Sequence, residues 1–119
     1  MTLAPETTTL KVQLRVDDAA DDWFTVCDLS ALMPGRGVAA LLPDGRQVAL
    51  FQDRAGRLYA IDNRDPFSGA AVLSRGLIGS HQGRPFVASP LLKQRFELES
   101  GRCLDDDAVT VATYEVRTR

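Results

Sequence analysis

The sequence predicts an all-β protein, an antiparallel β-sandwich of short strands with one or two short helical turns. In several short stretches apolar residues alternate with polar ones, which is the period of a half-buried strand. Turn sequences built on glycine separate these stretches, as P-D-G-R does after Leu42. The 119 residues, of which 45% are apolar and 25% charged, suit one compact domain.

The first predicted strand covers residues 10–16, where four apolar residues alternate with Lys11, Gln13 and Arg15. The residues before this strand are predicted to be loose. The acidic run D-D-A-A-D-D at residues 17–22 follows it and is predicted to be a solvated connector.

From Trp23 the chain is predicted to form short strands separated by turns, beginning with residues 23–27. Asp28 is a good N-cap for the helical turn L-S-A-L, which Pro34 and Gly35 end. The clearest hairpin crosses the turn P-D-G-R, and R-A-G-R and H-Q-G-R introduce two further strands. The strands predicted in this part of the chain cover residues 38–42, 47–51, 58–61, 85–88 and 96–98.

The second half of the chain adds one more helical turn and a last strand. The turn is A-A-V-L-S-R at residues 70–75, and Gly76 is predicted to end it. The strand covers residues 109–116, and its apolar pattern slips near Ala112, which predicts a β-bulge.

Five of the nine glycines are followed directly by an arginine. Glycine supplies the positive φ that a turn requires, and the arginine then resumes extended structure with its charge in water. These regular turn positions favour solvated arginines over a single anion site. The arginines are Arg36, Arg46, Arg57, Arg84 and Arg102.

Charge and hydropathy exclude several classes of partner. The net charge of −2 gives no overall basic field for nucleic acid or anionic lipid. No apolar stretch approaches the roughly 20 residues that a membrane-spanning helix needs, and no secretory signal is recognisable. We therefore expect a cytoplasmic protein that binds neither nucleic acid nor a membrane.

Few residues suit catalysis or metal binding. Cys27 and Cys103 are the only thiols and His81 is the only imidazole, which is too few for a self-contained tetrahedral zinc or iron–sulfur site. We expect both thiols to be reduced and packed, with a disulfide as the less favoured alternative. No nucleotide-binding or G-x-S-x-G motif is present. Spacing leaves open a catalytic triad through His81, and hence an independent hydrolase, although a turn is the usual place for an idle histidine.

Two loops combine proline with large apolar side chains where polar residues would be expected. They are N-R-D-P-F-S-G-A at residues 63–70 and S-P-L-L-K-Q-R-F at residues 89–96. Their order, with a helical turn and a hairpin between them and x-L-x-x-G-x-C after them, resembles the Rieske iron–sulfur domain. In that family one loop carries Cys-Pro-His and the other Cys-Pro-x-His. The four ligand positions correspond here to Asp65, Phe67, Ser89 and Leu92.

The residues at these positions differ in chemistry from the family's ligands. Phe67 and Leu92 have no lone pair, and Asp65 and Ser89 offer only hard oxygen where a thiolate is needed. The resemblance therefore implies a Rieske-like fold without a metal or cofactor in this chain. Phe67 and Leu92 either fill the space left by the metal, or stay exposed as an anchor for another protein.

The blocks D-P-F-S-G-A, L-S-R-G and A-S-P-L-L-K-Q-R-F resemble the small subunits of assimilatory NAD(P)H-dependent nitrite reductases, over residues 23–114. The resemblance implies an accessory subunit that is inactive alone. Its large-subunit partner is expected to carry FAD, an iron–sulfur cluster and sirohaem, and to reduce nitrite to ammonium. We divide the chain into an N-terminal extension, residues 1–22, and a Rieske-like domain, residues 23–119. The strand at residues 10–16 would then be an extra edge strand or a contact between chains.

We expect the face formed by the two loops to bind the large subunit. Alternatively, Lys93 and Arg95 are only the solvent side of a strand. A stand-alone Rieske-like interaction module, a regulatory subunit of another oxidoreductase and a homo-oligomer are further alternatives. The residues expected at the interface are Arg64, Phe67, Arg75, Leu92, Lys93 and Arg95.

Overall fold

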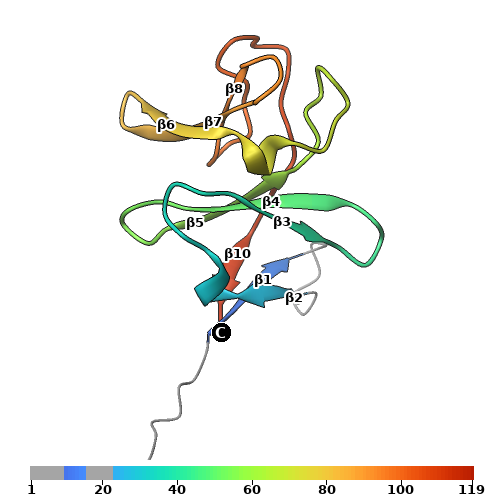
Figure 1. Cartoon of the computed structure of the whole chain (residues 1–119), viewed down its shortest axis with the longest axis vertical. Coiled ribbons are helices and arrows are strands. Elements are labelled where there is room, and N and C mark those ends of the chain that lie inside the picture. Colours follow the sequence, from blue (N-terminus) through green and yellow to red (C-terminus); the bar gives the residue numbers. More distant parts are fainter. Residues whose placement is uncertain (1–9, 16–22) are drawn as a thin grey trace, which may run out of the picture.

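The computed structural model describes residues 10–15 and 23–119, as ten strands and two short 3-10 turns (Figure 1). The prediction of an all-β fold with one or two short helical turns is confirmed. The elements are β1 (Lys11–Arg15), β2 (Trp23–Asp28), η1 (Leu29–Ala31), β3 (Val38–Leu41), β4 (Gln47–Gln52), β5 (Leu58–Asp62), η2 (Leu73–Arg75), β6 (Leu77–His81), β7 (Arg84–Ala88), β8 (Arg95–Glu97), β9 (Thr113–Tyr114) and β10 (Val116–Thr118).

The strands form three antiparallel sheets stacked along the long axis of the molecule (Figure 1). The first sheet has the strand order β10-β1-β2, the middle sheet β3-β4-β5-β9 and the third sheet β6-β7-β8. One apolar core lies between the first and middle sheets, and we call it the lower core. The upper core lies between the middle and third sheets, and the two proline loops lie beside it.

The strand β4 of the middle sheet is buried on both faces, because it supplies side chains to both cores. Along β4, Val48 and Leu50 enter the lower core, whereas Ala49 and Phe51 enter the upper core. All four side chains are fully buried. Since successive side chains of a strand point to opposite faces, a strand covered on both sides requires a continuous apolar run. The run V-A-L-F meets this requirement.

The strand predicted at residues 10–16 is β1, and it lies in the middle of its sheet. It pairs with β2 on one side and β10 on the other, so the prediction of an edge strand is wrong. Val12 and Leu14 are fully buried in the lower core. Residues 1–9 and 16–22, Val16 among them, lie outside the described residues. The division of the chain at residue 22 stays a prediction.

Two further differences concern local structure. Asp28 stands at the N-cap of η1 but makes no capping hydrogen bond, because its carboxylate pairs with Lys11 on the neighbouring strand. The strand β6 is the first strand of the hairpin expected between the two loops, but its bounds were not predicted, since Gly79 interrupts its apolar pattern. A Cβ atom at Gly79 would lie 2.6 Å from Cζ of Phe86. The ring of Phe86 therefore occupies the space beside the glycine and covers it.

The last strand is divided into β9 and β10, which belong to different sheets. The predicted bulge at Ala112 is wrong, since the Ala112 carbonyl still accepts a hydrogen bond from the Asp62 amide at 2.9 Å. The chain leaves the middle sheet at Glu115, whose carbonyl accepts from the Arg15 amide at 3.0 Å. This crossing joins the middle sheet to the first sheet.

The cysteines are free, as predicted. Cys103 is buried in the upper core and Cys27 is partly buried against the lower core. Within residues 10–15 and 23–119, no helix is long and apolar enough to cross a membrane.

Candidate docking site

The first proline loop follows β5 and is organised around Asp65. The Asp65 amide donates a hydrogen bond to the Ala70 carbonyl at 2.8 Å, and the Gly69 amide donates to the Asp65 carbonyl at 2.7 Å. The side chain adds a third bond, because its Oδ1 accepts from the Phe67 amide at 2.8 Å. Gly69 has a φ of +80°, a conformation that glycine adopts without strain. These bonds fix the shape of the loop.

The second loop repeats this pattern around Ser89. The Ser89 amide donates to the Gln94 carbonyl at 2.9 Å, and the Lys93 amide donates to the Ser89 carbonyl at 3.0 Å. The Ser89 hydroxyl accepts from the Leu91 amide at 3.3 Å. Lys93 occupies the position equivalent to that of the glycine in the first loop and has a φ of +69°, which is unfavourable for a residue with a side chain.

The two loops are joined by their central residues. The Ser89 hydroxyl donates a hydrogen bond of 2.6 Å to Oδ2 of Asp65, and both residues are buried, with exposed fractions of 2% and 0%. This length is typical of a hydroxyl bound to a carboxylate. Each carboxyl oxygen of Asp65 therefore has its own donor, which offsets the cost of burying the group.

The residues at the four ligand positions do not fit an iron–sulfur cluster. Asp65 and Ser89 bind each other directly, and Phe67 and Leu92 carry no donor atom. Rieske clusters need two thiolates and two imidazoles at these positions. No group of three or more His, Cys, Asp or Glu side chains in the described part of the chain could hold a metal ion.

Phe67 packs on the upper core. Its ring lies against Phe96, with ring centroids 6.2 Å apart and a tilt of 46° between the planes. This geometry is favourable for two aromatic rings. Of the two alternatives given for the apolar residues at the ligand positions, packing inside the protein or exposure as an anchor, Phe67 shows the first.

Leu92 does not fill the space between the loops. It is 52% exposed, as is its neighbour Leu91. Lys93, the next residue of the second loop, is also exposed, whereas the carboxylate of Asp65 is buried. Arg64 is exposed on the first loop, where it lines a groove with Asp62 of the middle sheet. We call the following exposed residues of the two loops the loop tip: Arg64, Pro66, Pro90, Leu91, Leu92 and Lys93.

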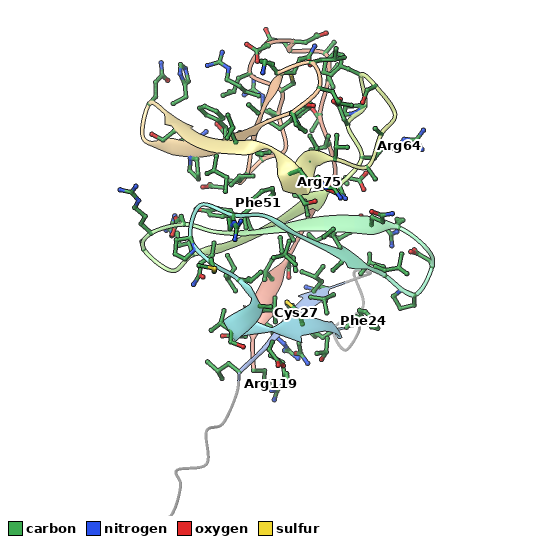
Figure 2. All side chains as sticks on the ribbon, in the orientation of Figure 1. Phe24, Cys27, Phe51, Arg64, Arg75 and Arg119 are labelled. Atoms are coloured by element: carbon green, nitrogen blue, oxygen red, sulfur yellow. The ribbon has the colours of Figure 1, made fainter. Side chains whose placement is uncertain are left out.

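Two arginines expected beside the loops have other surroundings. Arg95 binds Asp105 through two hydrogen bonds of 2.8 and 3.2 Å, and its guanidinium lies over the ring of Phe86. These hydrogen bonds hold the pKa of Asp105 below its ordinary value. Arg75 lies on η2 and lines a separate groove, whereas Arg64 lies on the first loop (Figure 2).

Sequence reasoning missed Asn63, which attaches the first loop to the middle sheet. Its side-chain amide donates to Oε1 of Gln47 at 3.2 Å, and its Oδ1 accepts from the Ser74 amide at 2.7 Å. It is 1% exposed. An asparagine directly after an apolar strand is a known turn residue, and that signal could have identified it.

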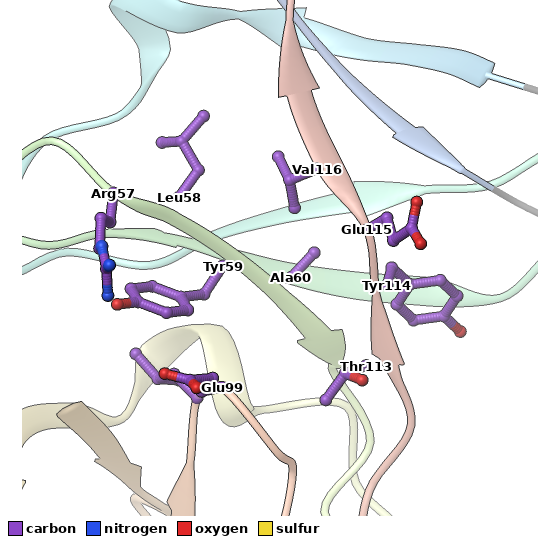
Figure 3. Close-up of a pocket in the computed structure, with 10 residues that line it drawn as sticks. Arg57, Leu58, Tyr59, Ala60, Glu99, Thr113, Tyr114, Glu115 and Val116 are labelled. Carbon is purple, nitrogen blue, oxygen red and sulfur yellow. The ribbon is translucent and has the colours of Figure 1, made fainter. Parts of the chain in front are cut away.

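Other grooves formed by the described residues contain no hydrogen-bonded group of catalytic side chains. The groove between β5 and the C-terminal strands has a volume of about 510 Å³ and is lined by side chains such as Arg57, Tyr59 and Glu99 (Figure 3). Its lining contains no serine, cysteine or histidine. His81 is exposed at the end of β6, where it lines a third groove with residues that include Cys103 and Asp107. Its side chain makes no hydrogen bond with either of them or with another described residue. The hydrolase interpretation therefore has no support in the geometry.

Comparison with known proteins identifies the class of fold. The family described as Rieske-like [2Fe-2S] domain matches residues 22–119. A crystal structure of a protein from Mycobacterium tuberculosis superposes with a TM-score of 0.74 at 48% identity, covering 82% of this chain and 94% of that one. The sheets and the paired proline loops thus define a Rieske-like domain.

The nitrite reductase (NADH) small subunit of Salmonella typhimurium is 47% identical over 98 residues, which are 82% of this chain and 90% of that protein. The chain belongs to the family of nitrite reductase small subunits. The nitrite reductase [NAD(P)H] large subunit of Klebsiella oxytoca is 44% identical over 95 residues, which are 80% of this chain and 10% of that longer protein.

Proposed function

We propose that this chain is the cofactor-free small subunit of an assimilatory NAD(P)H-dependent nitrite reductase and acts by assembling with the large subunit. The observation that carries the proposal is the bond between Ser89 and Asp65, which joins two former ligand positions in a member of this family. A chain without a redox centre contributes to nitrite reduction through the partner that it binds. In isolation it is inactive.

The Klebsiella oxytoca protein supports assembly with a large subunit. In that protein a segment similar to this chain forms part of a much longer polypeptide. A domain that is joined to a partner in one protein often binds the equivalent partner when the two are separate chains. In this proposal the large subunit carries FAD, an iron–sulfur cluster and sirohaem and reduces nitrite to ammonium, and the complex is cytoplasmic.

The loop tip is the proposed contact with the large subunit. Leu91 and Leu92 offer exposed apolar area, and Lys93 beside them in the chain adds a positive charge. Interfaces of this kind combine an apolar centre with a charged rim. The facing surface of the large subunit should therefore be apolar at its centre and acidic around it.

The structure of the loops suits this role because the tip is already ordered in the free chain. The hydrogen bond between Ser89 and Asp65 fixes the loops relative to each other, and Phe67 attaches the first loop to the core. A preformed surface loses little conformational entropy on binding. Once bound, the tip orders or covers part of the electron path in the large subunit.

Copurification with a sirohaem-containing large subunit tests the proposal. Wild-type chain should copurify, and Leu92→Asp combined with Lys93→Glu should weaken the complex by about tenfold or more. Leu41→Asp combined with Arg54→Glu is a matched control, since it makes the same change in charge at two exposed positions outside the tip. Absence of any complex would contradict the proposal and favour a stand-alone module or a subunit of another oxidoreductase.

A further inference from the structure

A second groove, with a volume of about 550 Å³, lies between the segment after η1 and the turn η2. No residue of the loop tip lines it. Met33 and Leu77 both line it, and their exposed fractions are 55% and 78%. Leu77 is the most exposed of the large apolar side chains in the described part of the chain. Two such side chains at one groove are typical of a binding surface.

The charge of this groove is purely positive. Arg36 and Arg75 are its only charged lining residues. Neither forms an ion pair or a side-chain hydrogen bond with another described residue. By contrast, Arg84, in another glycine–arginine turn, pairs with Glu97 at 3.2 Å. In a chain of net charge −2, two unpaired arginines on one groove favour an acidic partner.

The base of the groove is made of closely packed backbone. A Cβ atom at Gly37 would lie 2.3 Å from the carbonyl oxygen of Ser74, and one at Gly76 would lie 2.2 Å from that of Ala88. Both glycines line the groove. The two sides of the groove are therefore held at a fixed separation, and a ligand would enter a preformed surface.

The groove reaches the free edge of a sheet. Leu77, which lines the groove, is the first residue of β6. Within the described residues β6 is the outermost strand of its sheet and has β7 as its sole partner strand (Figure 1). The outer side of such a strand presents backbone N–H and C=O groups that an extended segment can pair with.

We propose that this groove is a second docking site, for an extended acidic segment of the large subunit. Its carboxylates would pair with Arg36 and Arg75, and an apolar side chain between them would pack against Met33 and Leu77. The segment would continue along the free edge of β6 as an additional strand. This inference rests on the proposed function, which supplies the partner, and it adds a site separate from the loop tip.

The test measures the dissociation constant between the full chain and the separately purified large subunit of the same organism. The double variant Arg36→Glu/Arg75→Glu should bind about tenfold more weakly or worse, with a reduced salt dependence. The matched control is Arg54→Glu/Arg119→Glu, which makes the same change in charge at exposed positions outside the groove and should bind like wild type. Leu77→Ser should also weaken binding, and its high exposure makes misfolding an implausible cause.

Hydrogen exchange measures the predicted strand pairing. Amides of Ile78 and Ser80 on β6 should gain protection in the complex, and this gain should disappear in Arg36→Glu/Arg75→Glu. The proposal is overturned if the control pair weakens binding equally, because charge would then act at long range. It is also overturned if the chain alone forms a dimer that the groove variants dissociate, because the occupant would be a second copy.

The two proposals fail in different ways. If wild-type chain does not bind the large subunit, the proposed function is wrong. If wild-type chain binds and the groove variants bind equally well, the proposed function stands and the groove is not a docking site.

Discussion

Ser89 and Asp65 lie on different loops, and the hydroxyl of one donates a 2.6 Å hydrogen bond to the buried carboxyl of the other. In the Rieske family the two equivalent residues are metal ligands. Here a direct bond between side chains holds the loops together. The position of the two loops relative to each other therefore depends on this hydrogen bond, and the ring packing of Phe67 attaches the first loop to the core.

Removal of the serine hydroxyl should destabilise the protein. Ser89→Ala leaves Oδ2 of Asp65 buried without its donor, so the free energy of unfolding should fall by about 1–3 kcal/mol. Urea unfolding followed by circular dichroism measures the change. Ser68→Ala is the control, because Ser68 is exposed and its hydroxyl makes only a solvent-accessible 3.2 Å hydrogen bond, accepted from the Ala70 amide. It should cost less than about 0.5 kcal/mol. Equal losses would contradict the role of the Ser89 bond.

Phe67 and Leu92 should behave oppositely when each is replaced by alanine. Phe67→Ala removes a ring packed on Phe96 and should cost about 2–3 kcal/mol of stability. Leu92→Ala should change stability by less than about 0.5 kcal/mol because the side chain is exposed. Binding to the large subunit should be weakened by Leu92→Ala. Thermal unfolding and a binding titration separate the two effects, and a large loss of stability in Leu92→Ala would refute this assignment.

Lys93→Gly should stabilise the free chain while weakening the complex. Lys93 has a φ of +69°, a conformation that costs a residue with a side chain about 1 kcal/mol relative to glycine. The greater freedom of glycine in the unfolded chain offsets part of this gain. A higher melting temperature together with a weaker complex is the expected combination. A lower melting temperature would show that the strain at this position is absent.

Gly37→Ala should be strongly destabilising, because the new Cβ atom would lie 2.3 Å from the Ser74 carbonyl and 2.6 Å from the ring of Phe51. Overpacking of this kind typically costs about 1–3 kcal/mol. Gly37 has no positive φ, so the loss comes from contact alone. Gly45→Ala is the comparison: it meets no atom within 4 Å but has a φ of +92°, and should cost about 1 kcal/mol.

Acid should weaken the turn that follows β8. The hydrogen bond from Ser100, aided by the charge of Arg84, lowers the pKa of Glu97 below its ordinary value near 4.5. A carboxyl with a lower pKa in the folded state contributes stability above its unfolded pKa, and loses it as pH falls through the folded pKa. Glu97→Gln should therefore reduce the loss of stability between about pH 5 and pH 3. Unfolding midpoints measured across this range test the sign.

Local chemistry explains the parts of the fold that could be predicted. The turn P-D-G-R encodes the hairpin of β3 and β4 because glycine supplies a positive φ at Gly45. The bounds of β6 could not be predicted from local pattern, since Gly79 becomes acceptable only when the ring of Phe86 covers it. The division between β9 and β10 likewise depends on which sheet receives each segment.

The sequence likewise predicts the positions of the candidate site but not the contacts between its residues. The family resemblance indicates which four positions have lost their ligands. It does not indicate that Asp65 and Ser89 bond to each other, because that contact depends on the distance between two loops. Nor does the resemblance indicate that Phe67 is packed whereas Leu92 is exposed. That difference arises because Phe67 lies against Phe96 and Leu92 remains 52% exposed.

Native mass spectrometry of the chain, purified without oxygen, tests the central claim most directly. If Asp65 and Ser89 hold the loops together in place of a metal, the mass should be that of the polypeptide alone. A species heavier by two irons and two sulfides per chain, and lost in Ser89→Ala, would contradict the account.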